Sequence, residues 1–154
     1  MGSAIVLLGT LGLVVVLLGR KYLSGPTTGE AKNTLGAIAR DAANAYERDG
    51  RVCPSASRPV PRDVALLRAR KYQSENGDWE VDRPRHAGFA CLGFSMGQPQ
   101  YYQYRYEASA TSFLAGARGD LDGDGDLSNF TVRGEVRDGR LVVSPSIEET
   151  DPEE

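Results

Sequence analysis

Four aspartates alternate within a short glycine-rich stretch, GDLDGDGDLSN, late in the chain. Carboxylates this close repel one another unless a hard cation neutralises them, and oxygens at alternate positions can wrap a calcium ion. The run D-x-D-x-D-G matches the first half of an EF-hand loop, but Thr131 occupies the position of its bidentate glutamate. We expect either a structural Ca²⁺ site closed by other oxygens or a solvated turn built from Asp and Gly. The candidate ligands are Asp120, Asp122, Asp124, Asp126 and Ser128.

Residue types that support catalysis are sparse. The single histidine, His86, lies beside Arg83 and Arg85 in an expected loop, and no Ser/His/Asp arrangement, phosphate-binding glycine loop or HExxH motif is present. The formal net charge is −3 and no basic stripe occurs, which argues against a nucleic-acid partner. The sequence therefore predicts a protein that is not an enzyme.

The chain has two cysteines, Cys53 and Cys91, whose spacing matches no metal or redox motif. They are either two buried free thiols or one disulfide. A disulfide would close a loop of about 38 residues and stabilise the fold by on the order of 3–4 kcal/mol. It would also require an oxidising compartment.

An uncharged apolar run extends from Ala4 to Leu18 and is followed by Arg20 and Lys21. Because no basic residue precedes the run, we expect a retained membrane helix rather than a cleaved signal peptide. The positive-inside tendency alone would place the following domain in the cytoplasm, whereas the paired cysteines favour export, which we adopt. Its glycines either form a stripe for close helix packing or reflect the general frequency of glycine in membrane helices. They are Gly2, Gly9, Gly12 and Gly19.

The elements that must position the acidic stretch follow from periodicity. Residues 30–48 show apolar positions at three- and four-residue steps, typical of an amphipathic helix, and residues 62–70 can form a short second helix. The stretch 52–61 is too rich in proline and serine for regular structure. We predict a transmembrane or filament-core helix over 1–23, a hinge over 24–29, a globular domain over 30–147 and an acidic tail over 148–154.

Strand patterns dominate the second half of the chain. We expect strands at 88–96 and 101–108 joined by a hairpin at 97–100, and at 130–137 and 140–144 joined by Asp138-Gly139. Tyr102, Tyr104 and Tyr106 share one face of the second strand. They form either a ligand platform or, as we favour, a surface packed against a helix. The predicted fold class is α+β, with one helix on an antiparallel meander of about four strands.

Two segments carry a family resemblance: EAKNTLGAIARDAANAY at 30–46 and FLAGARGDLDGDGDLSNFTVRGE at 113–135. With the apolar N-terminal run, they resemble type IV pilins and pseudopilin-like proteins of the deltaproteobacterial and myxobacterial kind. The resemblance implies a long helix, half in a membrane or filament core and half on a sheet, and it adds the calcium loop of major pseudopilins to the case for Ca²⁺. The chain departs from the family at its fifth residue, Ile5, where mature pilins have a glutamate.

The resemblance implies a structural subunit of an extracytoplasmic pilus-like or pseudopilus filament. Its partners would be further copies of itself, the membrane, and pilus or secretion assembly machinery. The expected location is the inner membrane facing the periplasm, and the cell surface when assembled. The alternative is a membrane-anchored periplasmic binding module with a calcium-stabilised loop that does not polymerise.

Overall fold

The computed structural model describes residues 27–152 and opens with a long helix over residues 27–49. The apolar segment 1–23 with its glycine stripe lies outside the described residues, as do residues 24–26 of the expected hinge. Residues 27–29, assigned to that hinge from their sequence, belong to the helix. Among residues 27–152, no helix combines the length and the apolar character that crossing a membrane requires.

The long helix buries one side against a sheet, as its periodicity predicts. The apolar positions at three- and four-residue steps are buried, and most are alanine, so the helix backbone can approach the sheet closely. The helix ends at Gly50, whose φ of +68° and N–H donated to the Tyr46 carbonyl at 2.8 Å form a left-handed cap. The buried side consists of Ala31, Leu35, Ile38, Ala39, Ala42 and Ala45.

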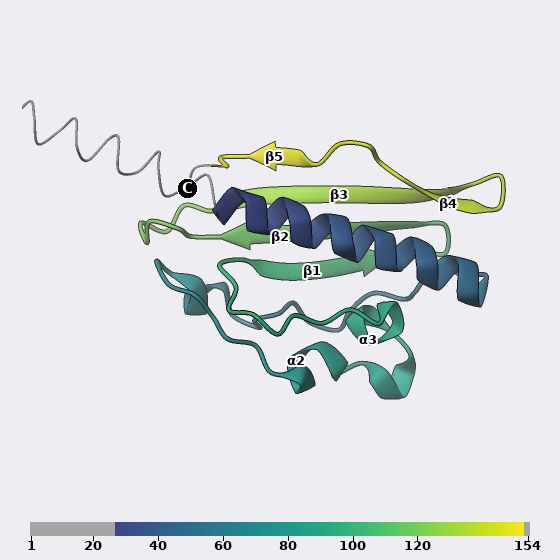
Figure 1. Ribbon diagram of the computed structural model, residues 1–154, viewed down its shortest axis with the longest axis horizontal. Coiled ribbons are helices and arrows are strands. Elements are labelled where there is room, and N and C mark those ends of the chain that lie inside the picture. Colours follow the sequence, from purple (N-terminus) through teal and green to yellow (C-terminus); the bar gives the residue numbers. More distant parts are fainter. Residues whose placement is uncertain (1–26, 153–154) are drawn as a thin grey trace, which may run out of the picture.

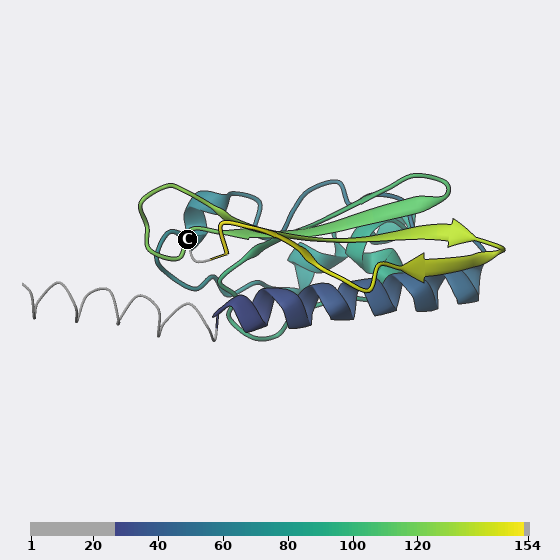
Figure 2. The same cartoon turned by 90° about the horizontal axis from the view of Figure 1, so that it is seen from above.

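The sheet is antiparallel and lies along one side of this helix (Figures 1 and 2). Its strands are β1 (Gln103–Ala108), β2 (Ser112–Gly119), β3 (Ser128–Arg137), β4 (Arg140–Val143) and β5 (Glu148–Thr150). They are ordered β1-β2-β3-β4, and β5 also pairs with β3. The α+β class and the antiparallel meander are thus confirmed, and the described sheet has five strands.

Strand β2 was not anticipated, because alanine and glycine have low strand propensity. Its period-two burial is nevertheless visible in Phe113, Ala115 and Ala117, which face the helix. The Phe113 ring covers Gly134 on β3, where an added Cβ would lie 2.2 Å from the ring. Small residues on this face leave room for the helix, so tertiary packing outweighs local propensity.

Strands β4 and β5 both pair with β3 and together form one edge of the sheet, with an interruption between them. Val143 pairs with Gly134 and Glu148 pairs with Thr131. The four residues 144–147 on this edge therefore lie opposite only two residues of β3, 132 and 133. Pro145 lies in this interruption and cannot donate a ladder hydrogen bond. Such a bulge protects an edge strand from pairing with another chain.

The connection between the long helix and β1 wraps the other edge of the sheet. It contains η1 (Val64–Leu67), α2 (Asn76–Glu80), η2 (Arg83–Arg85) and α3 (Gly88–Leu92), the small helices below β1 in Figure 1. The short helix expected within 62–70 is present as η1. Val60 forms an isolated bridge with Tyr104, so residues around Val60 cover the outer edge of β1.

The predicted strand at 88–96 and its hairpin at 97–100 are wrong, because this segment contains helix α3. Gly88, at φ +55°, starts α3 with its N–H bonded to the Pro54 carbonyl at 2.8 Å. Phe89 and Leu92, three positions apart, are both buried. A short apolar run is compatible with the periodicity of a helix and with that of a strand. In this segment the tertiary contacts favour the helix.

The tyrosines of β1 pack against the helix and do not form an exposed platform. Tyr102, Tyr104 and Tyr106 are at most 1% exposed. Tyr104 also lies near Trp79, with ring centroids 6.5 Å apart. The favoured interpretation of the tyrosine ladder is therefore confirmed.

Candidate functional site

The acidic stretch forms the loop between β2 and β3, and three of its aspartates converge. Asp120, Asp122 and Asp124 each place a carboxylate oxygen within 4.8 Å of the others. Asp120 is 4% exposed at the end of β2, whereas Asp122 and Asp124 face solvent. The alternation seen in the sequence thus brings three carboxylates to one point.

The loop backbone is shaped by the same carboxylates. Gly123 donates its N–H to Asp120 Oδ1 at 2.7 Å, and Asp124 donates its N–H to Asp122 Oδ1 at 3.2 Å. Gly123 and Gly125 have φ of +84° and +103°, values that favour glycine. These local hydrogen bonds hold one oxygen of Asp120 and one oxygen of Asp122 against the loop backbone.

An arginine from a distant segment contacts this acidic loop. Arg68, at the end of η1, places Nε 3.3 Å from Asp120 Oδ2, and the neighbouring Ala69 donates its N–H to the Asp120 carbonyl at 2.9 Å. Its guanidinium also lies against Gly125. Sequence reasoning missed Arg68, because a contact across more than fifty residues leaves no local signal. The Arg68 guanidinium thus offsets part of the negative charge of the three carboxylates.

Of the two remaining candidate ligands, Asp126 is not among the three convergent carboxylates. Asp126 is exposed, and its N–H donates to Asp124 Oδ1 at 2.8 Å. Ser128 is fully buried in β3, where its hydroxyl donates to the Gly119 carbonyl at 3.2 Å. Ser128 therefore closes the end of the β2–β3 pair.

The two cysteines form a disulfide that joins α3 to the loop after the long helix. Cys53 and Cys91 have Cα atoms 5.8 Å apart, and the bond closes a separation of 38 residues. This resolves the sequence-level alternatives in favour of the disulfide. The Cys91 sulfur lies near Asp49 and His86, but a disulfide sulfur is not a thiolate ligand, so these three do not form a metal site.

His86 pairs with the end of the long helix. Its Nε2 lies 3.2 Å from Asp49 Oδ2, and Arg48 donates to both carboxylate oxygens of Asp49 at 2.8 Å. Hydrogen bonds from Arg48 and then His86 lower the pKa of Asp49 to about 2. Arg48 and His86 thus share the Asp49 carboxylate at the end of the long helix.

A half-buried carboxylate that the sequence did not single out lies in the first turns of the long helix. Glu30 Oε1 accepts hydrogen bonds from the Tyr101 N–H at 2.9 Å and the Tyr104 hydroxyl at 3.2 Å. Burial raises the pKa of Glu30 above its usual value, despite these bonds and the nearby charge of Lys71. Glu30 joins the helix to the start of the sheet.

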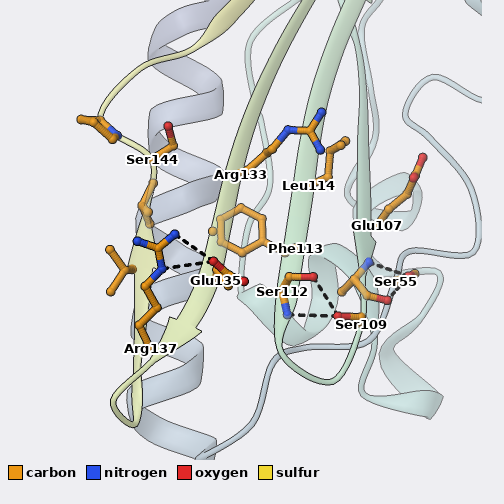
Figure 3. A pocket seen from close by; sticks show the side chains of 15 residues that line it. Ser55, Glu107, Ser109, Ser112, Phe113, Leu114, Arg133, Glu135, Arg137 and Ser144 are labelled. Carbon is orange, nitrogen blue, oxygen red and sulfur yellow. Dashed lines mark hydrogen bonds and ion pairs between the residues drawn. The ribbon is translucent and has the colours of Figure 1, made fainter.

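A groove of about 790 Å³ opens at the end of the sheet away from the acidic loop (Figure 3). Its serines serve the turns around them: Ser109 and Ser112 hydroxyls lie 2.8 Å apart, and Ser55 Oγ accepts the Ala108 N–H at 2.8 Å. Glu135 pairs with Arg137. His86 is not part of this lining, so no serine there has a histidine base.

Comparison with known proteins adds no assignment: no protein-family model, no curated protein and no solved structure matches this chain.

Proposed function

We propose that this protein is a structural subunit of an extracytoplasmic pilus-like or pseudopilus filament, assembled through its apolar N-terminal segment. The observation that carries the proposal is the long helix over residues 27–49, one side of which is buried along a sheet. In sequence it follows closely on the apolar run Ala4–Leu18. A helix held rigidly by a domain at one end can present its other end for packing against further copies.

The disulfide supports the location outside the cytoplasm. Cys53 and Cys91 are buried and bonded, and such bonds persist in the periplasm and outside the cell. The protected sheet edge, with Pro145 in its interruption, supports assembly through the helix rather than through strand pairing. The pairing of His86 with Asp49 and the turn bonds of the groove serines favour a structural role over a catalytic one.

The filament proposal is tested by negative-stain microscopy of sheared surface material together with variants of the glycine stripe. Gly9→Val with Gly12→Val puts β-branched side chains where helix backbones would approach, so fibres should be lost. The matched control, Leu7→Val with Val14→Leu, changes the opposite side of the same expected helix and should leave fibres intact. The proposal fails if the wild-type chain is never a fibre component, or if the two double variants assemble alike.

The second candidate is an anchored binding module whose β2–β3 loop is stabilised by calcium. It is favoured by the convergence of Asp120, Asp122 and Asp124, an oxygen donor set suited to a hard cation. Ca²⁺ held there would supply charge neutralisation, while Arg68 would offset part of the same negative charge. Light scattering of the detergent-solubilised chain separates the candidates: a strict monomer at every concentration supports the module, and concentration-dependent assembly supports the filament subunit.

A further inference from the structure

A small pocket on the face of the sheet turned away from the long helix gathers three arginines. It has a volume of about 260 Å³ and lies between β1 and the segment that covers its edge. Arg105 and Arg118 come from β1 and β2, and Arg58 comes from the covering segment. Arg105 and Arg118 lie diagonally across the β1–β2 pair, since Arg105 is opposite Gly116 and Arg118 is opposite Gln103. Like charges at such positions destabilise a sheet unless something offsets them.

Arg118 is held in place by a neutral partner. Gln103 is 1% exposed, and its amide donates to the Pro61 carbonyl at 2.8 Å and the Arg62 carbonyl at 3.3 Å. These two bonds orient the Gln103 side-chain oxygen, which accepts from Arg118 Nε. Within residues 27–152, no carboxylate forms an ion pair with Arg118, so its guanidinium is positioned but its charge is not neutralised.

The other two arginines have carboxylate partners, but Arg58 keeps one unsatisfied donor. Arg58 pairs with Asp78 through Nη2 at 3.3 Å, yet its Nε is buried and has no hydrogen-bond partner among the described residues. Arg105 lies flat over Gly116, where an added Cβ would come within 2.5 Å of Nε, and it pairs with the exposed Glu107 at 3.0 Å. A buried donor without a partner has a free-energy cost that a bound acceptor would remove.

We propose that this pocket binds an oxyanion, a carboxylate or phosphate group held by the guanidinium forks of Arg105 and Arg118 beside Arg58. Asp78 pairs with Arg58 and Glu107 pairs with Arg105, so the three guanidinium groups and two carboxylates leave one net positive charge at the site. Planar guanidinium groups suit two-pronged recognition of such anions. The site is independent of the filament proposal. The anion can be a free small ion or an acidic side chain from a second copy, whose residues 151–154, which follow β5, are DPEE.

The test is calorimetric titration of the full chain in a non-ionic detergent with two probes, inorganic phosphate and the peptide DPEE. We expect saturable binding that Arg118→Gln and Arg105→Gln each weaken by about tenfold to a hundredfold. Arg140→Gln, an exposed arginine outside the pocket, should bind like wild type. Unchanged thermal midpoints and circular dichroism would show that the pocket variants remain folded. Arg118→Lys keeps the charge without the fork and should recover binding only in part.

The two probes distinguish the sources of the anion. Tighter binding of the peptide than of phosphate, lost in Arg118→Gln, supports an acidic segment as the natural occupant, and the reverse order supports a free anion. The proposal is overturned if neither probe binds more tightly than a Kd of about 10 mM. It is also overturned if folded Arg118→Gln and Arg105→Gln proteins titrate like Arg140→Gln.

Discussion

The Tyr104 hydroxyl donates a hydrogen bond to Glu30 Oε1 at 3.2 Å and so joins the first turns of the long helix to strand β1. Burial raises the pKa of this carboxyl. Burial also raises the pKa of Tyr104, with the charge of Glu30 as the next contribution. The contact therefore joins a carboxyl group and a phenol whose pKa values are both raised by burial.

The first prediction concerns the pH dependence of stability at Glu30. Because the folded-state pKa is raised, the wild-type free energy of unfolding should fall as pH rises from 4.5, the ordinary value, through the folded-state pKa. Glu30→Gln resembles the protonated form and should not show this loss. Urea unfolding of both proteins between acid and neutral pH measures the difference. A constant difference in the free energy of unfolding between the two proteins across that pH range would contradict the raised pKa of Glu30.

The second prediction is that the stability contributed by Asp82 depends on pH in the opposite direction from that of Glu30. Asp82 is 1% exposed, and its Oδ2 accepts the Ser57 N–H at 2.7 Å while Arg85 pairs with Oδ1. Burial alone would raise the pKa of Asp82, but the bonds from Ser57 and Arg85 together lower it below its ordinary value. Its stabilisation is therefore present above pH 3.8 and is lost as pH falls through the lower folded-state pKa. Asp82→Asn should cost about 1–3 kcal/mol at neutral pH.

The measurement for Asp82 is again the free energy of unfolding, compared at neutral pH and in acid. The gap between wild type and Asp82→Asn should close as the pH falls below the folded-state pKa. Glu47→Gln, an exposed helical carboxyl, serves as the control and should change stability little. An Asp82→Asn protein as stable as wild type at neutral pH would contradict the role assigned to this carboxylate.

The disulfide should account for a large part of the stability of the domain. Replacing both Cys53 and Cys91 by alanine should lower the free energy of unfolding by about 3–4 kcal/mol, because the open chain gains conformational freedom when unfolded. Alkylation before and after reduction, read by intact mass, checks that the native protein has no free thiol. Labelling of two thiols without reduction would contradict the bond.

The Phe113–Gly134 contact predicts opposite results for two identical substitutions. Gly134→Ala forces a methyl group into the Phe113 ring and should cost about 1–3 kcal/mol. Gly36→Ala, in open space on the long helix, should instead stabilise by about 0.5–1 kcal/mol. Adding Phe113→Ala should relieve most of the Gly134→Ala penalty in a double-mutant cycle. Strictly additive effects would show that the ring does not occupy this space.

Calcium should stabilise the chain through the β2–β3 loop. At a concentration one hundred times its Kd, Ca²⁺ should add about 2.7 kcal/mol, seen as a higher thermal midpoint that a chelator reverses. Asp122→Ala with Asp124→Ala should abolish the response, whereas Glu47→Ala should keep it. A midpoint that EDTA and Ca²⁺ leave unmoved would mean that the loop is a turn held by Arg68 and its own hydrogen bonds.

The sequence by itself determined the elements whose signals are local. The long helix, β1, β3 and β4 follow from apolar periodicity and from Asp138-Gly139, and the buried side of Tyr102, Tyr104 and Tyr106 follows from alternation. The convergence of three aspartates likewise follows from their spacing. These features depend on residues that are only a few positions apart, so their pattern can be read directly from the sequence.

Only the tertiary structure decided the features that join distant segments. It placed α3 where a strand was expected, because the bond between Cys53 and Cys91 and the contact of Gly88 with the Pro54 carbonyl hold that segment against the core. It brought Arg68 to Asp120 and Glu30 to Tyr104, and it allowed the alanine-rich β2 to pair because the helix packs closely above it. Each of these features depends on contacts with residues that are distant in the sequence. Local periodicity does not indicate such contacts.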